Sequence, residues 1–144
     1  MLSELYQNVM GEPEVLTAVL KNRVEYFHAL GEKYAEVKRI FVIGSGTSFH
    51  CGLSTRYAME KLTGAEVTAV YPSVFLEMNN LPEKALCIGI SQSGRSALTI
   101  KCLEKCRAAG WYTLAVSSNR PSPVTEVADD YIPLVVGIEH SAST

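Results

Sequence analysis

Two short loops rich in hydroxyl groups contain the residue types that could do chemistry in this chain. Ser45-Gly46-Thr47-Ser48 lies between an apolar run and a helical stretch, and so does Ser91-Gln92-Ser93-Gly94-Arg95-Ser96. Free N–H groups and the positive dipole end at a helix N-terminus favour an anion. Glycine lets the backbone approach a ligand closely, and hydroxyls donate hydrogen bonds without adding charge. Two such loops facing each other could wrap a phosphate group.

The loops differ from the common nucleotide-binding patterns. Neither loop is GxxxxGK[ST], so no lysine is in place for a nucleoside triphosphate. Gly44-Ser45-Gly46 begins like a dinucleotide fingerprint, but the third glycine would fall at Phe49, and the second strand ends at Tyr71 rather than at an acidic ribose ligand. A small phosphorylated metabolite fits these loops better. The alternative interpretation is that the hydroxyls are only N-caps of the helices that follow.

Apolar runs alternating with helical patterns must position these loops. The apolar runs predict five strands, at 39–43, 66–71, 85–90, 111–116 and 131–136. Helical spacing predicts helices at 13–36, 49–62, 73–80, 97–109 and 123–128. Near-continuous apolar strands indicate burial on both faces, so we expect an α/β fold: a three-layer sandwich with a five-stranded parallel sheet flanked by helices, in flavodoxin-like order. With strand order 2-1-3-4-5, strands one and three flank the switch point where ligands bind.

Individual residues refine these boundaries. Pro13 suits the first position of the first helix, and Gly31 is a candidate for its interruption or end. Ser122 is well placed as the N-cap of the short helix at 123–128. Cys102 and Cys106 are four residues apart on one helix face, where we interpret them as small hydrophobic residues of the core.

Composition excludes several classes of protein. The 144 residues are enough for one domain, and 19% are charged, below the roughly 25% usual for soluble domains, which indicates an element hidden on both faces or an interface. The formal charge is −2, and the scattered basic residues form no nucleic-acid footprint. The chain has no membrane-length apolar run, signal peptide, CxxC or zinc-ligand spacing. We therefore expect a soluble cytoplasmic protein with no metal, cofactor, nucleic-acid or membrane partner.

The loop sequences resemble a known family. Ile43-Gly-Ser-Gly-Thr-Ser48, Ser91-Gln-Ser-Gly94 and Ser141-Ala-Ser-Thr144 together resemble the SIS (sugar isomerase) domain. The resemblance is closest to the first SIS domain in the isomerase half of glucosamine-6-phosphate synthases and of fructosamine-6-phosphate deglycases. It covers essentially the whole chain. It implies a domain that binds a hexose or hexosamine 6-phosphate, with a helical lead-in over 1–37 and the SIS domain over 38–144.

The resemblance also assigns roles to residues. It implies phosphate ligands at Ser91, Gln92, Ser93 and Ser96. It implies further contacts with the sugar and phosphate at Gly46, Thr47, Ser48, Ser141 and Ser143. Two positions depart from the synthases: Arg95 replaces a glutamate, and Ser45 replaces a cysteine. These departures favour a relative of the synthases and leave the identity of the sugar open.

Catalytic residues stay unknown at this point. In two-domain members the enolisation base, the ring-opening histidine and a lysine belong to a second SIS domain, which would start after residue 144. Glu77 and Glu139 are loose candidates for a base, and His50 and His140 for an acid, but none matches a family position. We therefore expect a fragment without the second SIS domain that binds a sugar phosphate but does not isomerise it.

Three functional hypotheses remain open. The first is one half of an aldose/ketose-phosphate isomerase or a deglycase. The second is a non-catalytic sugar-phosphate sensor, and the third is a flavodoxin-like domain with no ligand in these loops. A helix-turn-helix is not expected at 1–37, where we predict one clear helix. The low charge and a last strand without a following helix to cover it predict a homodimer or larger assembly.

Overall fold

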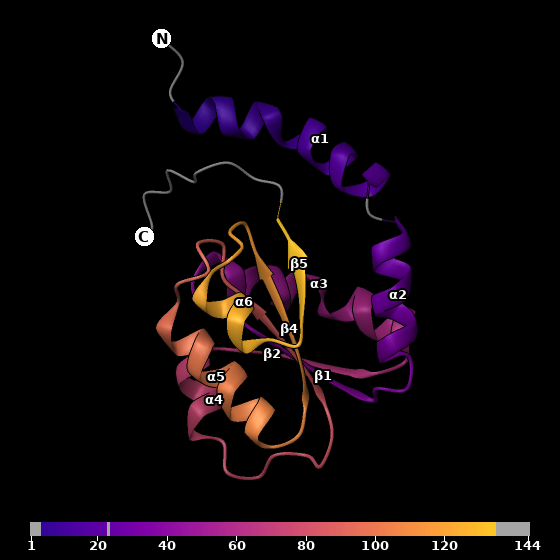
Figure 1. Ribbon diagram of the computed structural model, residues 1–144, viewed down its shortest axis with the longest axis vertical. Helices are drawn as coiled ribbons and strands as arrows, with labels where there is room; N and C mark the ends of the chain where they lie inside the picture. Colours follow the sequence, from indigo (N-terminus) through magenta and orange to yellow (C-terminus); the bar gives the residue numbers. More distant parts are fainter. Residues whose placement is uncertain (1–3, 23, 135–144) are drawn as a thin grey trace.

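The computed structural model describes residues 4–22 and 24–134 as a parallel α/β domain preceded by two helices (Figure 1). The strands are β1 (Arg39–Ile43), β2 (Glu66–Val70), β3 (Leu86–Ile90), β4 (Tyr112–Ser117) and β5 (Asp130–Pro133). The helices are α1 (Glu4–Asn22), α2 (Val24–Tyr34), α3 (Thr47–Thr63), α4 (Pro72–Glu77), α5 (Ala97–Ala108) and α6 (Pro123–Val127). All strand pairs are parallel and the order is β2-β1-β3-β4-β5, which confirms the predicted sheet.

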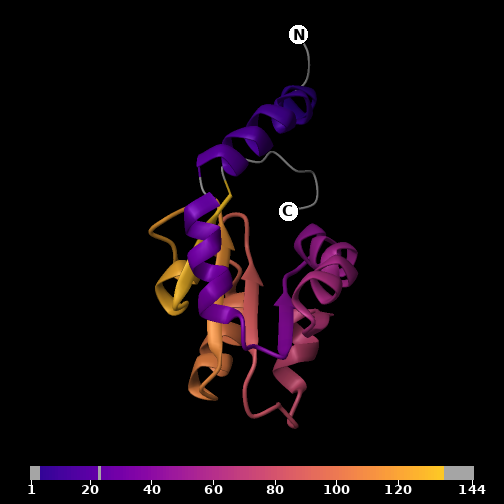
Figure 2. The same ribbon diagram turned by 90° about the vertical axis from the view of Figure 1, so that its right-hand side faces the viewer.

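The sheet separates two hydrophobic layers, as Figure 2 shows with helices on both sides of the strands. One layer packs helices α4, α5 and α6 against the sheet around Phe41, Phe75 and Leu103. The other packs α2 and α3 around Leu30, Val42 and neighbouring strand residues. Apolar side chains on both faces of β1 explain why this strand is a continuous apolar run rather than an alternating one.

The cysteines at the centre of the first layer behave as core residues. Cys87, Cys102 and Cys106 are fully buried thiols. Burial raises the pKa of Cys102 to about 12, because the thiolate would lose its hydration. A thiol that stays protonated is a poor nucleophile, which applies to Cys102. The complete burial of Cys102 and Cys106 in the core confirms their interpretation as small hydrophobic residues.

The N-terminal region differs from the prediction of a single helix at 13–36. It forms two helices, and the first begins well before Pro13, which lies inside α1 rather than at its first position. The hydroxyl of Thr17 donates to the Pro13 carbonyl oxygen at 2.8 Å. Gly31 lies within α2 and does not end it. A proline removes only one helix hydrogen bond, and on this exposed helix its ring is accommodated without ending the helix.

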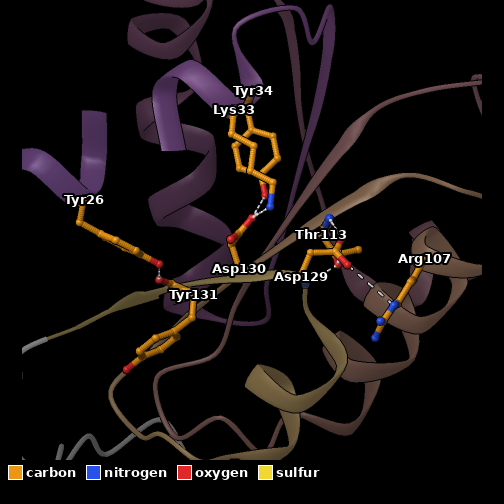
Figure 3. Close-up of polar contacts among 8 residues, drawn as sticks. All are labelled: Tyr26, Lys33, Tyr34, Arg107, Thr113, Asp129, Asp130 and Tyr131. Atoms are coloured by element: carbon orange, nitrogen blue, oxygen red, sulfur yellow. Dashed lines mark hydrogen bonds and ion pairs between the residues drawn. The ribbon is translucent and has the colours of Figure 1, made fainter. Parts of the chain in front are cut away.

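Helix α2 contacts the edge strand β5 through polar groups (Figure 3). Lys33 Nζ lies 2.5 Å from Asp130 Oδ2, and the Tyr34 hydroxyl donates to the same carboxylate. The Tyr26 hydroxyl donates to the carbonyl oxygen of Tyr131. We refer to these contacts as the α2–β5 clamp. The expectation that no helix covers the last strand is therefore wrong, because a helix from the start of the chain contacts it.

Asp129, the residue before β5, forms hydrogen bonds with β4 and an ion pair with α5. Asp129 Oδ2 accepts hydrogen bonds from the backbone N–H and the hydroxyl of Thr113, at 2.9 and 2.8 Å. Arg107 Nε lies 3.8 Å from the other carboxylate oxygen, as Figure 3 shows. Thr113 is fully buried, so this carboxylate satisfies polar groups at the point where the chain enters β5.

Candidate functional site

The carboxyl ends of β1 and β3 bring the two hydroxyl-rich loops to one edge of the sheet. Ile43 of β1 pairs with Gly89 of β3, so the strands that precede the loops are direct neighbours. We call residues 44–48 the first loop and residues 91–96 the second loop. Strand order reverses between β1 and β3, since the chain moves outward to β2 on one side and to β4 on the other. This is the switch point at which open parallel sheets bind ligands.

The first loop contains the glycine that caps α3. Gly46 is the N-cap of α3 with φ 55°, a left-handed value that glycine adopts without a steric penalty. Thr47 and Ser48 form the first turn of the helix, with Thr47 exposed and Ser48 partly buried. Within the described part of the chain, neither hydroxyl has a hydrogen-bond partner. The two hydroxyls therefore do not cap α3, and both are available to a ligand at its positive end.

The second loop is a tight turn whose hydroxyl oxygens accept hydrogen bonds. Gly94 N donates to the Ser91 carbonyl oxygen at 3.0 Å. Ser91 Oγ accepts from the backbone N–H of Ser96 at 3.3 Å, and Ser93 Oγ accepts from that of Arg95 at 3.4 Å. Ser96 Oγ accepts from the hydroxyl of Thr99 at 3.0 Å.

These contacts leave the protons of the three hydroxyls available. A serine hydroxyl has one proton to donate, and in each contact the serine oxygen is the acceptor. Ser96 is the N-cap of α5, yet its side chain makes no capping hydrogen bond. The alternative interpretation of these serines as simple N-caps therefore does not describe the second loop. A phosphate group requires hydrogen-bond donors of this kind, located at the N-terminus of a helix.

A third loop, residues 118–122, supports the second one, a role that was not predicted from the sequence. The backbone N–H of Ser118 and the hydroxyl of Ser117 both donate to the Gln92 carbonyl oxygen, at 3.0 and 3.2 Å. Asn119 Nδ2 donates to the carbonyl oxygen of Ser93 at 3.2 Å. The available signal was composition, because this loop after β4 contains Ser118, Asn119 and Ser122 and is thus about as rich in small polar residues as the loops after β1 and β3.

Ser122 of the third loop lies close to the second loop. It is the N-cap of α6 in a reciprocal capping box with Thr125, which confirms its predicted role. A Cβ atom added at Gly94 would lie 2.3 Å from Ser122 Oγ, and Gly94 has φ 72°. The second loop therefore needs glycine at this position for two reasons, a left-handed backbone and a close neighbour.

Charge around the loops has one sign among the described residues. Arg95 and Arg120 are exposed on the second and third loops, and none of the three loops contains a carboxylate. Across the described ranges 4–22 and 24–134, no group of three His, Cys, Asp or Glu residues is placed to hold a metal ion. None of the helices in those ranges is long and apolar enough to cross a membrane. The site suits an anion bound by neutral and positive donors.

Some candidate residues lie elsewhere. Glu77 is the last residue of α4, and its neighbours Leu76 and Met78 each accept a hydrogen bond from Lys105 near the C-terminal end of α5. Since α5 begins at the second loop, Glu77 is at the far end of that helix and is not part of the site. His50, in contrast, lies next to the first loop, exposed in the first turn of α3, where its backbone N–H donates to the Gly46 carbonyl oxygen. The candidates Glu139, His140, Ser141 and Ser143 lie outside the described residues.

The fold and the loops define a class of protein: a parallel α/β domain that presents hydroxyl donors at its topological switch point. The SIS domain family matches residues 33–144, and the chain belongs to this family. The glutamine--fructose-6-phosphate aminotransferase [isomerizing] of Aquifex aeolicus is 28% identical over 130 residues, 90% of this chain and 21% of that protein. The enzyme of that name from Methanocaldococcus jannaschii is 31% identical over 135 residues, 94% of this chain and 12% of that protein.

Solved structures show the same fold. The C-terminal domain of glucosamine-fructose-6-phosphate aminotransferase from Francisella tularensis has a TM-score of 0.82 at 21% identity, covering 94% of this chain and 40% of that chain. The tagatose-6-phosphate ketose/aldose isomerase of Escherichia coli has a TM-score of 0.77 at 21% identity, covering 91% of this chain and 39% of that chain. The chain thus spans about a fifth of the curated relative from Aquifex aeolicus and about two fifths of these solved chains.

Proposed function

We propose that this chain is the sugar-phosphate binding domain of an aldose/ketose-phosphate isomerase or a fructosamine-6-phosphate deglycase. Its ligand is a hexose or hexosamine 6-phosphate, bound between the first and second loops. Ser91, Gln92, Ser93 and Ser96 hold the phosphate in this proposal. Gly46, Thr47, Ser48, Ser141 and Ser143 line the sugar and phosphate. Membership of the SIS family and the names of the relatives support this ligand class.

The observation that carries the proposal is the hydrogen-bond direction in the second loop. The oxygens of Ser91, Ser93 and Ser96 accept from groups of the protein itself, so their protons are left for the ligand. Hydrogen bonds to a charged phosphate oxygen are worth more than those to a neutral group. An anion is therefore the ligand that gains most from this arrangement.

Three finer statements extend the proposal. The protein acts in the cytoplasm, and the names of its relatives, which are those of metabolic enzymes, support this location. The working state is a homo-oligomer, supported by the low charged fraction of 19%. The domain division at residues 37 and 38 is part of the same proposal.

The test is a thermal shift with sugar phosphates. Ligand at about one hundred times its dissociation constant should stabilise the fold by about 2.7 kcal/mol. For a domain of this size that raises Tm by about 5–10 °C. Fructose 6-phosphate and glucosamine 6-phosphate are the probes, with fructose and glucosamine as controls that lack the phosphate. No shift with either phosphate at millimolar concentration would refute the proposal.

The Ser93→Ala variant localises the site. Loss of one hydrogen bond to a charged group should weaken binding by about 1–2 kcal/mol, a factor of about 5–30. Ser54→Ala is the matched control, because Ser54 is an exposed serine two turns into α3 whose hydroxyl contacts only the Cys51 carbonyl oxygen. Equal dissociation constants for wild type and Ser93→Ala by calorimetry would place the ligand elsewhere.

A further inference from the structure

Tyr131 of β5 contacts three other parts of the chain. Its carbonyl oxygen accepts a hydrogen bond from the Tyr26 hydroxyl of α2. Its own hydroxyl donates to the Ser117 carbonyl oxygen at the end of β4, at 3.0 Å. The Arg120 guanidinium of the third loop lies 5.4 Å from the centre of its ring. Figure 3 shows the ring pointing away from Tyr26, so the residue connects α2 on one side with the third loop on the other.

The hydrogen bond from Tyr131 ends on a peptide unit that also contacts the second loop. The Ser117 carbonyl and the Ser118 N–H belong to the same planar trans peptide, so they point in opposite directions. The carbonyl oxygen accepts from the Tyr131 hydroxyl and from the Leu134 N–H, at 3.0 and 2.8 Å. On the opposite side, the Ser118 N–H donates to the Gln92 carbonyl oxygen at 3.0 Å. Fixing the carbonyl therefore also fixes the N–H that holds Gln92.

The same geometry repeats at the next peptide unit. The Gln92 carbonyl and the Ser93 N–H also belong to one planar trans peptide. The Gln92 oxygen faces the third loop, so the Ser93 N–H points the other way, toward the first loop, because β3 lies between β1 and β4. Among the described residues the Ser93 N–H has no hydrogen-bond partner. It is a backbone donor available to an anion in the second loop.

These contacts form one chain of hydrogen bonds with a single direction. It runs from the Tyr131 hydroxyl through the peptide of Ser117 and Ser118 to the peptide of Gln92 and Ser93. In such a chain each hydrogen bond polarises the next amide group, so the last N–H becomes a stronger donor. Ser117 is fully buried, so water does not compete for its carbonyl oxygen. An anion at the Ser93 N–H therefore gains from the Tyr131 hydroxyl, although two peptide units separate them.

We infer that Tyr131 is a positioning residue for the ligand phosphate, acting through Ser117 and Gln92. The inference rests on the proposed function, since it takes the second loop as the phosphate site. The Tyr131 hydroxyl fixes the third loop against the second, and the Tyr26 hydroxyl fixes the backbone of Tyr131. Helix α2 thereby contributes to the site as well as covering the edge of the sheet.

The test compares wild type, Tyr131→Phe and Thr113→Val by calorimetry on the full chain. Tyr131→Phe removes the hydroxyl and keeps the ring. Because one hydrogen bond is lost, the dissociation constants of inorganic phosphate and of glucosamine 6-phosphate should rise by the same factor, about 3–10-fold. Thr113→Val is the matched control, because it removes a buried hydroxyl that donates to Asp129 near the other end of β4. Its dissociation constants should equal those of wild type.

A second variant acts on Tyr131 without changing it. Tyr26→Phe removes the hydrogen bond that fixes the Tyr131 carbonyl on α2, and Tyr26 is exposed, so the domain stays folded. Both dissociation constants should again rise by equal factors, about 2–5-fold.

Amide hydrogen exchange separates positioning from a loss of overall stability. In Tyr131→Phe without ligand, the Ser118 N–H should exchange about 3–10-fold faster relative to the amides of β1 in the same protein. This ratio, measured by NMR, should not change in Thr113→Val, even where its overall stability falls.

The outcomes distinguish the inference from its alternatives. Wild-type affinity for phosphate in Tyr131→Phe would overturn it, and so would an unchanged exchange ratio or a weaker binding shared by Thr113→Val. Weaker binding of glucosamine 6-phosphate alone would show that Tyr131 contacts the sugar instead of positioning the phosphate site. A wild-type chain that binds neither ligand would refute the proposed function, and the positioning role with it.

Discussion

At the scale of single residues, hydrogen-bond direction matters more than residue type. The serines of the second loop would look alike in any Ser/Gly-rich turn, and either capping or ligand binding could explain them. In the structure Ser91, Ser93 and Ser96 each accept a hydrogen bond from a group within or next to the loop. Each of these hydroxyls can still donate one hydrogen bond, which suits an anionic ligand and does not suit a cation.

A prediction at this scale concerns Gly94. Gly94→Ala adds a Cβ at φ 72° and only 2.3 Å from Ser122 Oγ, whereas Gly110→Ala adds one at φ 79° with nothing within 4 Å. Gly110→Ala should cost about 1 kcal/mol through backbone strain alone, and Gly94→Ala about 2–4 kcal/mol because the third loop must also move. Urea unfolding of both variants measures this difference. If the two variants lose the same stability, the close packing of Gly94 on Ser122 is incorrect.

At the scale of elements, the clamp between α2 and β5 joins segments from opposite ends of the chain. Burial alone would raise the pKa of Asp130, but the hydrogen bonds from Lys33 and Tyr34 outweigh it and hold that pKa below its ordinary value. The hydrogen bond from Lys33 to Asp130 likewise raises the pKa of Lys33. Both pKa shifts mean that the charged forms of Asp130 and Lys33 stabilise the contact of α2 with β5.

This pairing predicts a pH dependence. A carboxylate whose pKa is lower in the folded protein contributes stability above its unfolded pKa of about 4 and loses it as the pH falls through the folded value. The Tm of wild type should therefore exceed that of Asp130→Asn at pH 7, and the gap should narrow below about pH 4. Thermal melts of both proteins from pH 7 to pH 3 measure the gap. A gap that is constant over this range would show that the carboxylate charge does not hold α2.

At the scale of the whole molecule, the sheet order places the loops and separates the binding groups from Glu77, the one candidate base among the described residues. The three described loops at the carboxyl edge contain hydroxyls, amides and two arginines, whereas Glu77 lies at the far end of α5. Binding the ground state without a positioned base lowers the energies of substrate and transition state together. General acid and base groups typically supply about 10²–10⁴-fold each.

We therefore predict that the purified chain binds a hexose 6-phosphate without catalysing proton exchange. The measurement is incubation with fructose 6-phosphate or glucosamine 6-phosphate in D₂O, followed by NMR at the carbon next to the carbonyl group. Deuterium should enter no faster than in a control without protein. Rapid exchange that is abolished by Glu139→Gln or Glu77→Gln would show that the chain carries its own base and would contradict this prediction. Slow exchange together with tight binding is also what a sensor would show.

The sequence by itself determined the layout of the core domain. Apolar runs and helical spacing are local patterns, so the five strands, the helices at 47–63, 97–108 and 123–127 and the two hydroxyl-rich loops were predictable to within a few residues. The parallel order followed from the alternation of strands and helices, since short right-handed connections allow few arrangements. The loop residues alone were enough to predict an anion site.

Only the tertiary structure decided which groups meet across distant segments. The clamp joins Tyr34 to Asp130, and Asn119 supports the backbone at Ser93; no local pattern encodes such pairs. The break between α1 and α2 was missed because the apolar spacing continues through it, and Pro13 was misplaced because a single exposed proline does not end a helix. Local propensity sets each element, whereas the partner of each hydrogen bond depends on how the elements pack.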